Sequence, residues 1–527
     1  MIERELHPVL TCEEAAEWEA SFLTDKEKEW EAMQKVGRKL GSSLYRDFQE
    51  AAFWSENARI LLLVGKGHNG GDALLAAATL AKMKQGLVVD ILSPSGPETW
   101  KPLTRRAWEV LENSLEKGPG TARIYVWPRG PENPVYDVAL DGLLGMQFRP
   151  PLRSPFPALF EKVRDWRIGF RAAVDLPSGL HEKGDGMILS SDVTYLTGIA
   201  KKPVFGAEAG NHVGRIRYLD IGFFDHGAPG KEGGSQQPSL LTKACLDELR
   251  QPRKAGSYKN REGHLWVMGG SMSYPGSIFL TVKAAVQSGA GLVTAFIPEP
   301  LVPSFAARLP EAIWMGCPVT SGGGLSYETK AIWEKARGRC DALVVGPGLG
   351  SDSESHRLVG EVAAETSAPV ILDAEALCPE IRSLVAKKNP TDVIATPHRN
   401  ELYRLLGREP GADWTDEAFL EAARELGWHL LLKGPPFNRL TWGSGLAYVT
   451  TGGPVLARGG SGDILAGMIG RMVAREKANG GSDWAAALAR SVYWHGAAAE
   501  EAAIMEGAET IRTSRILAYL SVALRKV

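Results

Sequence analysis

The sequence predicts an α/β protein with two domains, each built on a parallel β-sheet between layers of helices. Its 527 residues exceed the size at which a single hydrophobic core stops growing. Apolar runs of strand length alternate with longer helical patterns along most of the chain, as expected of successive βαβ units. Between about 223 and 251, a stretch rich in Gly, Pro, Ser and Gln interrupts this alternation and predicts a linker.

The first predicted domain covers residues 1–228. Two helices are expected between 11 and 57, where apolar residues recur at helical spacing. Continuous apolar runs are typical of parallel strands buried on both faces, and they predict strands at 59–64, 87–92, 136–141 and 171–175. The Gly-rich segment 65–72 predicts a turn, and 73–84 predicts a helix. This order is typical of a doubly wound sheet.

The second predicted domain covers residues 251–527 and follows a linker region at 229–250. It repeats the alternation, with a helix expected at 277–288. Its strands are predicted at 264–268, 292–296, 342–345, 370–372, 393–395 and 430–432. Ligands of open α/β sheets bind just beyond the carboxyl ends of strands, so we expect the functional residues there.

Composition and charge narrow the class of protein. A net charge of -2 argues against binding to nucleic acid or to an anionic membrane. The five cysteines have no C-x-x-C spacing, which argues against a disulfide framework and a zinc site. The N-terminal residues lack a signal pattern, and no apolar run reaches membrane-spanning length. We therefore expect a cytoplasmic protein that acts on small molecules.

A glycine pattern in the first domain resembles a dinucleotide-binding fingerprint. Gly65, Gly67 and Gly70 follow a strand, and Asp90 comes about twenty positions later, so an NAD-dependent oxidoreductase is one alternative. However, Asp72 lies where a pyrophosphate should bind. Carboxylate and amide oxygens at a strand end suit a hard cation or a hydroxyl-rich ligand better.

Acidic residues follow three of the predicted strands in this domain. Asp72, Asp141 and Asp175 each come at or just after a carboxyl end, and Ser178 follows a rigid Pro turn. Each residue alone could simply cap a helix or form a turn. Because the carboxyl ends of parallel strands meet at one edge, we expect the three acids to converge in one crevice.

The first domain resembles the NAD(P)H-hydrate epimerase family, which is Rossmann-like. The resemblance lies in NGGD at 69–72, DGLLG at 141–145, VDLPSG at 174–179 and DIG at 220–222. It departs from the family pattern at His68, at Ala73 and in the loop 145–151. The resemblance implies a potassium ion held by Asn69, Asp141 and Ser178, and a catalytic role for Asp175. It also implies substrate contacts at His68, Asn69, Gly70, Gly71, Asp72, Gly145, Met146, Gln147, Phe148, Arg149, Pro150, Pro151 and Asp175.

A second glycine-rich motif, GGSGD at 459–463, precedes an apolar helical run in the second domain. Backbone N–H groups at such a helix start attract phosphate, because they carry the positive end of the helix dipole. A carboxylate there would oppose phosphate binding unless it had another role, such as accepting a proton from a substrate hydroxyl. Asp463 is therefore a candidate base, with a helix cap as the alternative.

The second domain resembles the ADP- or ATP-dependent NAD(P)H-hydrate dehydratase family, which is ribokinase-like. Besides 459–463, the resemblance lies in GGS at 269–271, GPGLG at 346–350, LDAEAL at 372–377, TPH at 396–398 and LKG at 432–434. It departs from the family at Tyr258, Ser277, Glu375, Asn400 and Gly453. The resemblance implies substrate contacts at Ser277, Gly348, His398 and Asp463. It implies nucleotide contacts at Lys433, Gly434, Pro435, Pro436, Phe437 and Gly462.

Together the two resemblances imply repair of hydrated NADH and NADPH. The first domain would interconvert the R and S epimers, and the second would dehydrate the S epimer with ADP and magnesium, giving AMP and phosphate. Asp463 would remove the proton of the ring hydroxyl, whose oxygen attacks the terminal phosphate. The alternatives are a small-molecule kinase, or a dehydratase whose first domain only binds ligand. A homo-oligomer is also expected.

Overall fold

The computed structural model describes residues 2–51, 54–182, 184, 186–206, 209–228, 237–252, 255–256, 258–336, 339–411 and 414–526. The chain forms two compact units, Met1–Ser235 and Gln236–Val527. Part of the predicted linker, at 229–236, lies outside the described residues. The remainder forms β10 (Ser239–Leu241) and α7 (Asp247–Arg250), and β10 pairs with a strand of the second unit. The predicted domain borders at 228 and 251 stay predictions.

The first unit contains a parallel sheet with the strand order β4-β3-β2-β5-β6-β7-β9. Its strands are β2 (Arg59–Val64), β3 (Val88–Ser93), β4 (Thr121–Val126), β5 (Val135–Gly142), β6 (Arg167–Val174), β7 (Val193–Thr197) and β9 (Arg215–Leu219). The chain builds outward from β2 to β4 and then returns to add β5 on the other side of β2. Such a reversal of direction opens a crevice at the carboxyl ends of β2 and β5.

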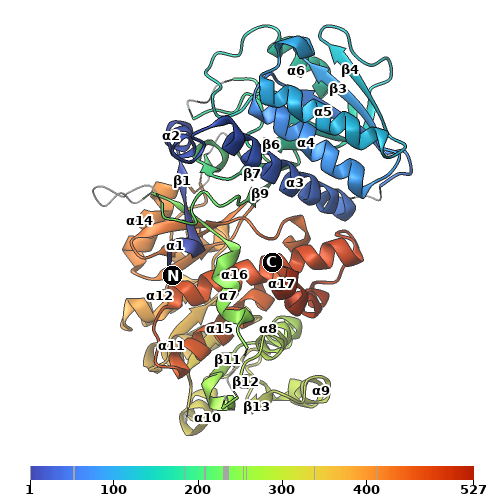
Figure 1. Cartoon of the computed structure of the whole chain (residues 1–527). Coiled ribbons are helices and arrows are strands. Elements are labelled where there is room, and N and C mark those ends of the chain that lie inside the picture. The colour runs from blue at the N-terminus through green and yellow to red at the C-terminus, as the bar shows by residue number, and fades with distance from the viewer. Residues whose placement is uncertain are drawn as a thin grey trace. The chain divides into compact units, whose positions relative to one another are not determined.

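Helices cover both faces of this sheet. Figure 1 shows α3 (Lys26–Ala51), α4 (His68–Met83) and α5 (Pro102–Glu116) side by side on one face. Their apolar residues share a core with Ile60, Leu62 and Val64 of β2. Leu61 and Leu63 point to the other face, into the core that contains α6 (Phe156–Arg164). The continuous apolar run therefore forms a strand buried on both faces, as predicted.

One predicted boundary in this unit was wrong. Residues 65–72 were expected to form a turn, but α4 begins at His68, five residues before the predicted start. Gly70 serves close packing rather than a turn, because a side chain there would place its Cβ 2.1 Å from the carbonyl oxygen of Gly65. Asn69 and Asp72 consequently project from the first turns of a helix.

The N-terminal segment adds a short parallel pair to the first unit. The segment begins with α1 (Ile2–Glu5) and β1 (Leu6–Leu10), and β1 pairs with β8 (Ala200–Lys201). Helix α2 (Cys12–Phe22) follows β1. Thr11 begins α2 with a reciprocal capping arrangement with Glu14. The prediction of helices between 11 and 57 is confirmed by α2 and α3, whereas β1, β4, β7, β8 and β9 were not predicted.

The sheet of the second unit has the strand order β13-β12-β11-β14-β15-β16-β17-β18-β19-β10. It runs parallel from β13 to β17 and ends in the antiparallel pairs β17–β18 and β18–β19. The strands are β11 (His264–Met268), β12 (Leu292–Pro298), β13 (Ile313–Cys317), β14 (Ala342–Val345), β15 (Val370–Leu372), β16 (Val393–Ala395), β17 (His429–Leu432), β18 (Asn438–Trp442) and β19 (Gly445–Val449). Every strand predicted in this unit is present.

The helices of the second unit complete its α/β layers. They are α8 (Pro275–Gln287), α9 (Val302–Arg308), α10 (Thr329–Ala336), α11 (Ser353–Glu365), α12 (Pro379–Val385), α13 (Arg399–Leu406), α14 (Asp416–Leu426), α15 (Ser461–Ala478), α16 (Trp484–Glu506) and α17 (Leu520–Lys526). A Cβ at Gly470 of α15 would lie 2.5 Å from Val344 of β14, so this glycine lets the helix pack closely on the sheet. The predicted α/β fold class is confirmed.

Within the described ranges, none of the helices has the length and apolar character needed to cross a membrane.

Candidate active sites

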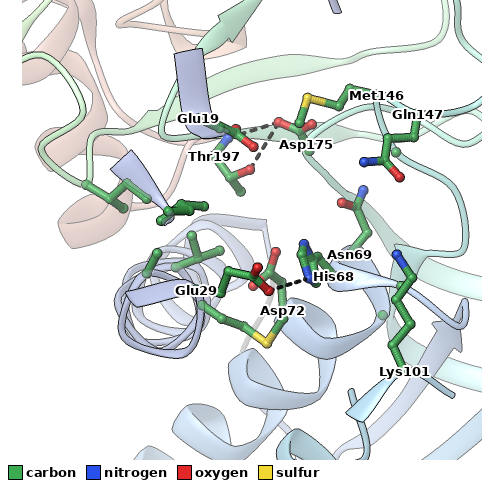
Figure 2. A pocket seen from close by; sticks show the side chains of 18 of the residues that line it. Glu19, Glu29, His68, Asn69, Asp72, Lys101, Met146, Gln147, Asp175 and Thr197 are labelled. Carbon is green, nitrogen blue, oxygen red and sulfur yellow. Dashed lines mark hydrogen bonds and ion pairs between the residues drawn. The ribbon is translucent and has the colours of Figure 1, made fainter. Parts of the chain in front are cut away.

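A cavity lies at the carboxyl ends of β2, β5, β6 and β7 in the first unit. Figure 2 shows side chains from α2, α3, the start of α4 and the loops after β5 and β6 around it. Eight of the predicted site residues line this cavity: His68, Asn69, Gly70, Asp72, Gly145, Met146, Gln147 and Asp175. The reversal of strand order therefore positions the site, as expected for an open α/β sheet.

Other residues predicted for substrate binding lie outside this lining: Gly71, Phe148, Arg149, Pro150 and Pro151. A side chain at Gly71 would come within 2.9 Å of the sulfur of Met33, so this glycine allows α4 to pack against α3. Arg149 donates hydrogen bonds to the carbonyl oxygens of Met146 and Phe148. It thereby shapes the loop beside the cavity.

The Asp175 carboxylate at the cavity is held by hydrogen bonds from two other side chains. Its Oδ1 atom accepts hydrogen bonds from Nζ of Lys201 at 2.6 Å and from Oγ1 of Thr197 at 3.1 Å. Both Asp175 and Lys201 are buried. Asp175 has a φ of 66°, a backbone conformation that costs energy for a residue with a side chain. Surrounding contacts hold it there, and strained residues of this kind concentrate at functional sites.

Two further carboxyl groups of the cavity are protonated more readily than usual. Burial raises the pKa of Asp72 well above its ordinary value, and the nearby carboxylates of Asp175 and Glu19 raise it further. Burial likewise raises the pKa of Glu19 to about 7, although Lys201 opposes the shift. Glu19 and Lys201 were not predicted from the sequence, because neither belongs to a glycine-rich or strand-end motif. A lysine in the mostly apolar stretch 197–201 was the available signal.

Asp141 lies behind the cavity wall in a cluster of oxygen atoms. Its carboxylate accepts hydrogen bonds from the Ser178 hydroxyl at 2.7 Å and from backbone N–H groups of Ser178 and Leu143. Asn69 donates from its side chain to the carbonyl oxygens of Leu144 and Val174. Burial raises the pKa of Asp141 to about 6. Of the three acids expected to converge, Asp72 and Asp175 line the cavity and Asp141 supports its wall.

His68 occupies the position where the family pattern has asparagine. Its Nε2 atom lies 3.6 Å from Oε2 of Glu29 on α3, and Figure 2 shows this pair at the cavity. Burial lowers the pKa of His68, so the ring is mainly neutral at neutral pH. The substitution therefore replaces an amide by a larger neutral ring that contacts the helix opposite.

Asp90 does not have the role that a dinucleotide fingerprint assigns to it. This residue is buried, and its Oδ2 atom accepts hydrogen bonds from Arg59 at 3.1 Å and from the Tyr136 hydroxyl at 2.8 Å. A ribose-binding carboxylate has to face the ligand. The geometry of Asp90 therefore removes one of the observations behind the oxidoreductase alternative.

In the second unit, Asp463 lies in the first turn of α15. This helix starts directly after its N-cap residue Gly460, which has a φ of 88°. Burial raises the pKa of Asp463 to about 6, and Asp373 adds to this effect, whereas a hydrogen bond with Ser277 and the charge of Lys433 oppose it. A Cβ at Gly348 would lie 3.1 Å from the Cβ of Ser277. The fold thus brings together Asp463, Ser277 and Gly348, which were predicted from separate motifs.

Lys433 connects this group to the neighbouring strand ends. Its Nζ atom lies 2.9 Å from Oδ1 of Asp373 and 3.9 Å from Oε2 of Glu401. A Cβ at Gly462 would come within 3.4 Å of the same Nζ atom, so Gly462 keeps the helix start open beside the lysine. Asp373 was noted as part of a motif but was not predicted as a site residue. Its position directly after β15 was the signal that could have identified it.

His398 is the N-cap residue of α13. Its Nδ1 atom accepts hydrogen bonds from the backbone N–H groups of Asn400 and Glu401, and Nε2 lies 3.4 Å from Oε1 of Glu401. Burial and the charge of Lys433 lower its pKa. A backbone bridge pairs His398 with Lys433. His398 therefore has a structural role as a cap and lies beside the predicted nucleotide lysine.

The predicted nucleotide segment 434–437 shows mixed exposure. Gly434 and Pro435 are exposed and Pro436 is half-buried. Phe437 is buried, packs against Tyr448 at 4.9 Å between ring centroids, and is covered by the guanidinium group of Arg439. Phe437 therefore anchors the segment in the core, and its backbone neighbours are the part open to a ligand.

Comparisons with known proteins match both halves of the chain. A family model described as NAD(P)H-hydrate dehydratase matches residues 265–521, and one described as YjeF-related protein N-terminus matches residues 29–202. A solved ADP/ATP-dependent NAD(P)H-hydrate dehydratase from Bacillus subtilis, co-crystallised with ATP and Mg²⁺, is 28% identical, with a TM-score of 0.45 over 53% of this chain and 96% of that chain. A ribokinase-like superfamily protein from Enterococcus faecalis is 25% identical, with a TM-score of 0.46 over 55% of this chain and 95% of that chain.

Curated relatives extend over nearly the whole chain. The bifunctional NAD(P)H-hydrate repair enzyme Nnr of Gloeobacter violaceus is 33% identical and covers 89% of this chain and 88% of its own length. The enzyme of the same name from Moorella thermoacetica is 30% identical, with 94% and 92% covered. Two matching domains in the same order, over almost the full length of both chains, show that this chain belongs to the family of bifunctional NAD(P)H-hydrate repair enzymes.

Proposed function

We propose that this protein repairs hydrated NADH and NADPH in two steps on one chain. The first unit interconverts the R and S epimers of the hydrate, and the second dehydrates the S epimer back to NAD(P)H with ADP. The observation that carries this proposal is the presence of both family domains on one chain, with the buried Asp175 at a strand end of the first and the half-buried Asp463 at a helix start of the second. An epimerase alone completes no repair, so the pairing makes chemical sense.

For the first unit, we assign substrate binding to the cavity and catalysis to Asp175. The predicted contacts from His68 to Asp72, from Gly145 to Pro151 and at Asp175 are part of this assignment. Eight of these residues line the cavity, which supports it. Asp175 has Lys201 and Thr197 to hold its carboxylate in one orientation, as a residue that transfers protons requires.

The oxygen cluster beside the cavity fits a potassium ion. Asn69, Asp141 and Ser178 offer amide, carboxylate and hydroxyl oxygens, which are the donors that hard cations prefer. The Asp141 carboxylate is buried, and no salt bridge reaches it from any residue that the structure describes. A bound cation would supply the missing positive charge and keep the loops after β5 and β6 in place around the substrate.

For the second unit, we assign the role of catalytic base to Asp463. The carboxylate takes the proton of the hydrate's hydroxyl, and the hydroxyl oxygen forms a bond to the terminal phosphorus of ADP as AMP leaves. The carbon–oxygen bond then breaks and phosphate leaves with its electron pair, while the adjacent ring carbon loses a proton to water, which restores the ring double bond of NAD(P)H. Substrate contacts come from Ser277, Gly348 and His398.

The nucleotide is proposed to bind along Lys433 to Phe437 and at Gly462, with magnesium on its phosphates. Lys433 supplies a positive charge, and the start of α15 presents free backbone N–H groups to the transferring phosphate. Gly462 lies beside the Lys433 ammonium group, so the two features act on the same phosphate. The predicted cytoplasmic location and homo-oligomeric state stay predictions.

The test is conversion of a mixed-epimer hydrate by the full-length protein, followed by recovery of NADH absorbance with ADP and with ATP. We expect complete recovery with one nucleotide and release of one phosphate per NADH. Conversion of only the S fraction would instead favour the alternative in which the first unit binds ligand without activity. A stable phosphorylated product would favour the kinase alternative.

A further inference from the structure

Four ionisable groups of the first unit lie at its cavity or directly beside it. Asp72 comes from α4, Asp175 from the end of β6, Lys201 from β8 and Glu19 from α2. The Lys201 ammonium group lies 2.6 Å from Asp175 and 3.7 Å from Glu19. Glu19 also lies outside residues 29–202, the part of the chain that the N-terminal family model matches. Sequence motifs predicted Asp72 and Asp175 but neither Glu19 nor Lys201.

A single ammonium group cannot neutralise three carboxylates away from water. Asp175 takes the close contact with Lys201 and also accepts hydrogen bonds from Thr197, so it is the group held in the ionised form. Asp72 is about 7% exposed, and its Oδ1 atom has no hydrogen-bond partner within the described part of the chain. A buried carboxyl group without a partner retains its proton. Its raised pKa agrees with this conclusion.

Epimerisation of the hydrate needs both an acid and a base. The hydroxyl-bearing ring carbon is inverted only if one of its bonds breaks and forms again on the opposite face. When the carbon–oxygen bond breaks, the hydroxyl must receive a proton and leave as water. The cation that remains is stabilised by the ring nitrogen, and the water that adds to the other face must give up a proton. Two carboxyl groups in opposite protonation states meet this need.

We propose that Asp72 is the general acid and Asp175 the general base of the epimerisation, which rests on the proposed epimerase function. Asp72 protonates the hydroxyl, water leaves, and Asp175 takes a proton from the water that adds on the other face. One water molecule leaves and one is gained, and one proton passes from Asp72 to Asp175. Figure 2 shows the two carboxyl groups on different sides of the cavity, as attack on opposite faces requires. In the reverse direction the two roles exchange.

Lys201 is a positioning residue in this scheme, and Glu19 exchanges the proton with solvent. After one turnover, Asp175 carries a proton and Asp72 does not, so the site must be reset before the next substrate reacts in the same direction. Glu19 contacts Lys201 and its side chain is about 20% exposed, so it joins the buried pair to water. The other charged groups at the cavity are Glu29, paired with His68, and Lys101. Cys12 of α2 also lies near Asp175, and its backbone N–H donates a hydrogen bond to Oε1 of Glu182 at 2.7 Å.

The first experiment follows the label from heavy-oxygen water in the wild-type protein. The pure R epimer of NADH hydrate is incubated without nucleotide in H₂¹⁸O. The S product is then separated, and its molecular mass is measured by mass spectrometry. We expect one solvent oxygen in each S molecule formed, well above the enzyme-free control. Epimerisation without solvent oxygen would overturn the scheme, because the carbon–oxygen bond would have stayed intact.

The second experiment compares the substitutions Asp72→Asn and Glu27→Gln in the full chain. Asparagine has the same shape as the neutral carboxyl group but cannot give up a proton, so kcat should fall about 10²- to 10⁴-fold with KM nearly unchanged. Glu27 is an exposed residue of α3 that pairs with Arg106 and is not among the residues that line the cavity, so its substitution should leave the rate unaltered. Near-normal kcat in Asp72→Asn would overturn the assignment of the acid.

The pH profile separates an acid from a structural role. In wild-type protein, the rate should fall at high pH as the acid loses its proton, and Asp72→Asn should lack this limb. A lower rate with the limb intact would mean that Asp72 only supports the fold, and would overturn the proposal. Failure of the proposed function is distinguishable, because wild-type protein would then show no epimerisation above the enzyme-free rate while the dehydratase still consumed the S epimer.

Discussion

The Nζ atom of Lys433 lies 2.9 Å from Oδ1 of Asp373, and both groups are at strand ends. The hydroxyl of Thr396 donates to the same Asp373 oxygen at 2.5 Å. The first unit contains a similar pair, Lys201 and Asp175, with Thr197 as the additional donor. In each case a strand-end aspartate holds a lysine. Lys433 was predicted from the LKG motif, whereas Lys201 was not predicted. The ion pair holds the lysine side chain in one position, so that its positive charge stays beside the substrate site.

Replacing Lys433 with methionine should impair only dehydration. The change removes the charge proposed to contact phosphate, so kcat for dehydration should fall about 10²- to 10³-fold. Stopped assays of NADH recovery with ADP would measure it. Epimerisation by the same protein is the internal control, because its cavity lies in the other unit. Equal loss of both activities would show that the substitution disturbs folding rather than catalysis.

Replacing Asp463 with asparagine should abolish turnover and leave nucleotide binding largely intact. Loss of a positioned base costs about 10²- to 10⁴-fold in rate. In wild-type protein, the base must be ionised to act. Because the pKa of Asp463 is raised to about 6, the rate should decline as the pH falls through 6. Initial rates between pH 5 and 8 would test this, and a flat profile would contradict the role of Asp463.

Potassium should raise the melting temperature of the first unit, more at pH 7.5 than at pH 5. The folded pKa of Asp141 is raised to about 6, so between the unfolded value of about 3.8 and 6 the folded state binds more protons. Its stabilising contribution is complete below this window and is lost as the pH rises through it. A cation relieves the buried negative charge only when Asp141 is ionised.

Scanning calorimetry in potassium and in tetramethylammonium chloride would measure this effect. The substitution Asp141→Asn provides the matched control, because it keeps the side-chain shape and removes the charge. We expect the potassium-dependent shift to disappear in this variant. An equal potassium shift in the variant would mean that the ion acts elsewhere.

Replacing Lys201 with methionine should destabilise the first unit strongly. Removing one partner of a buried ion pair costs about 3–5 kcal/mol, because the remaining charge has no counterpart. The double substitution with Asp175→Asn should recover most of this loss and still lack epimerase activity. Denaturant unfolding followed by fluorescence would measure the stability. A single variant as stable as wild type would show that the pair contributes little.

Several parts of both sites could be predicted from the sequence alone. The apolar run at 59–64 predicted a strand buried on both faces, because a continuous apolar run of strand length before a glycine-rich segment is typical of a parallel strand, and residues 60–64 are indeed buried. Asp175, directly after β6, and Asp463, in the first turn of α15, were identified because each stands at the end of an element. Position at the end of an element is a local property, and local patterns record it.

The start of α4 shows where local reasoning failed. The glycines at 65–71 suggested a turn, yet the helix begins at His68. Gly70 is required because α4 passes close to the carbonyl group of Gly65, and Gly71 because α3 lies against it. Glycine serves equally for a turn and for close packing, and only the neighbouring elements decide between them.

The amino-acid sequence was enough to predict the α/β class, most strands near the two sites and the motifs that carry the family resemblance. Which groups share a site depends on how the elements pack. Lys201 and Glu19 reach Asp175 because β8 and α2 lie at the end of β6. Glu19 and Asp175 are 156 residues apart in the sequence, so no local motif contains both. Burial and partners then set the protonation of each acid, and both are properties of the packed fold.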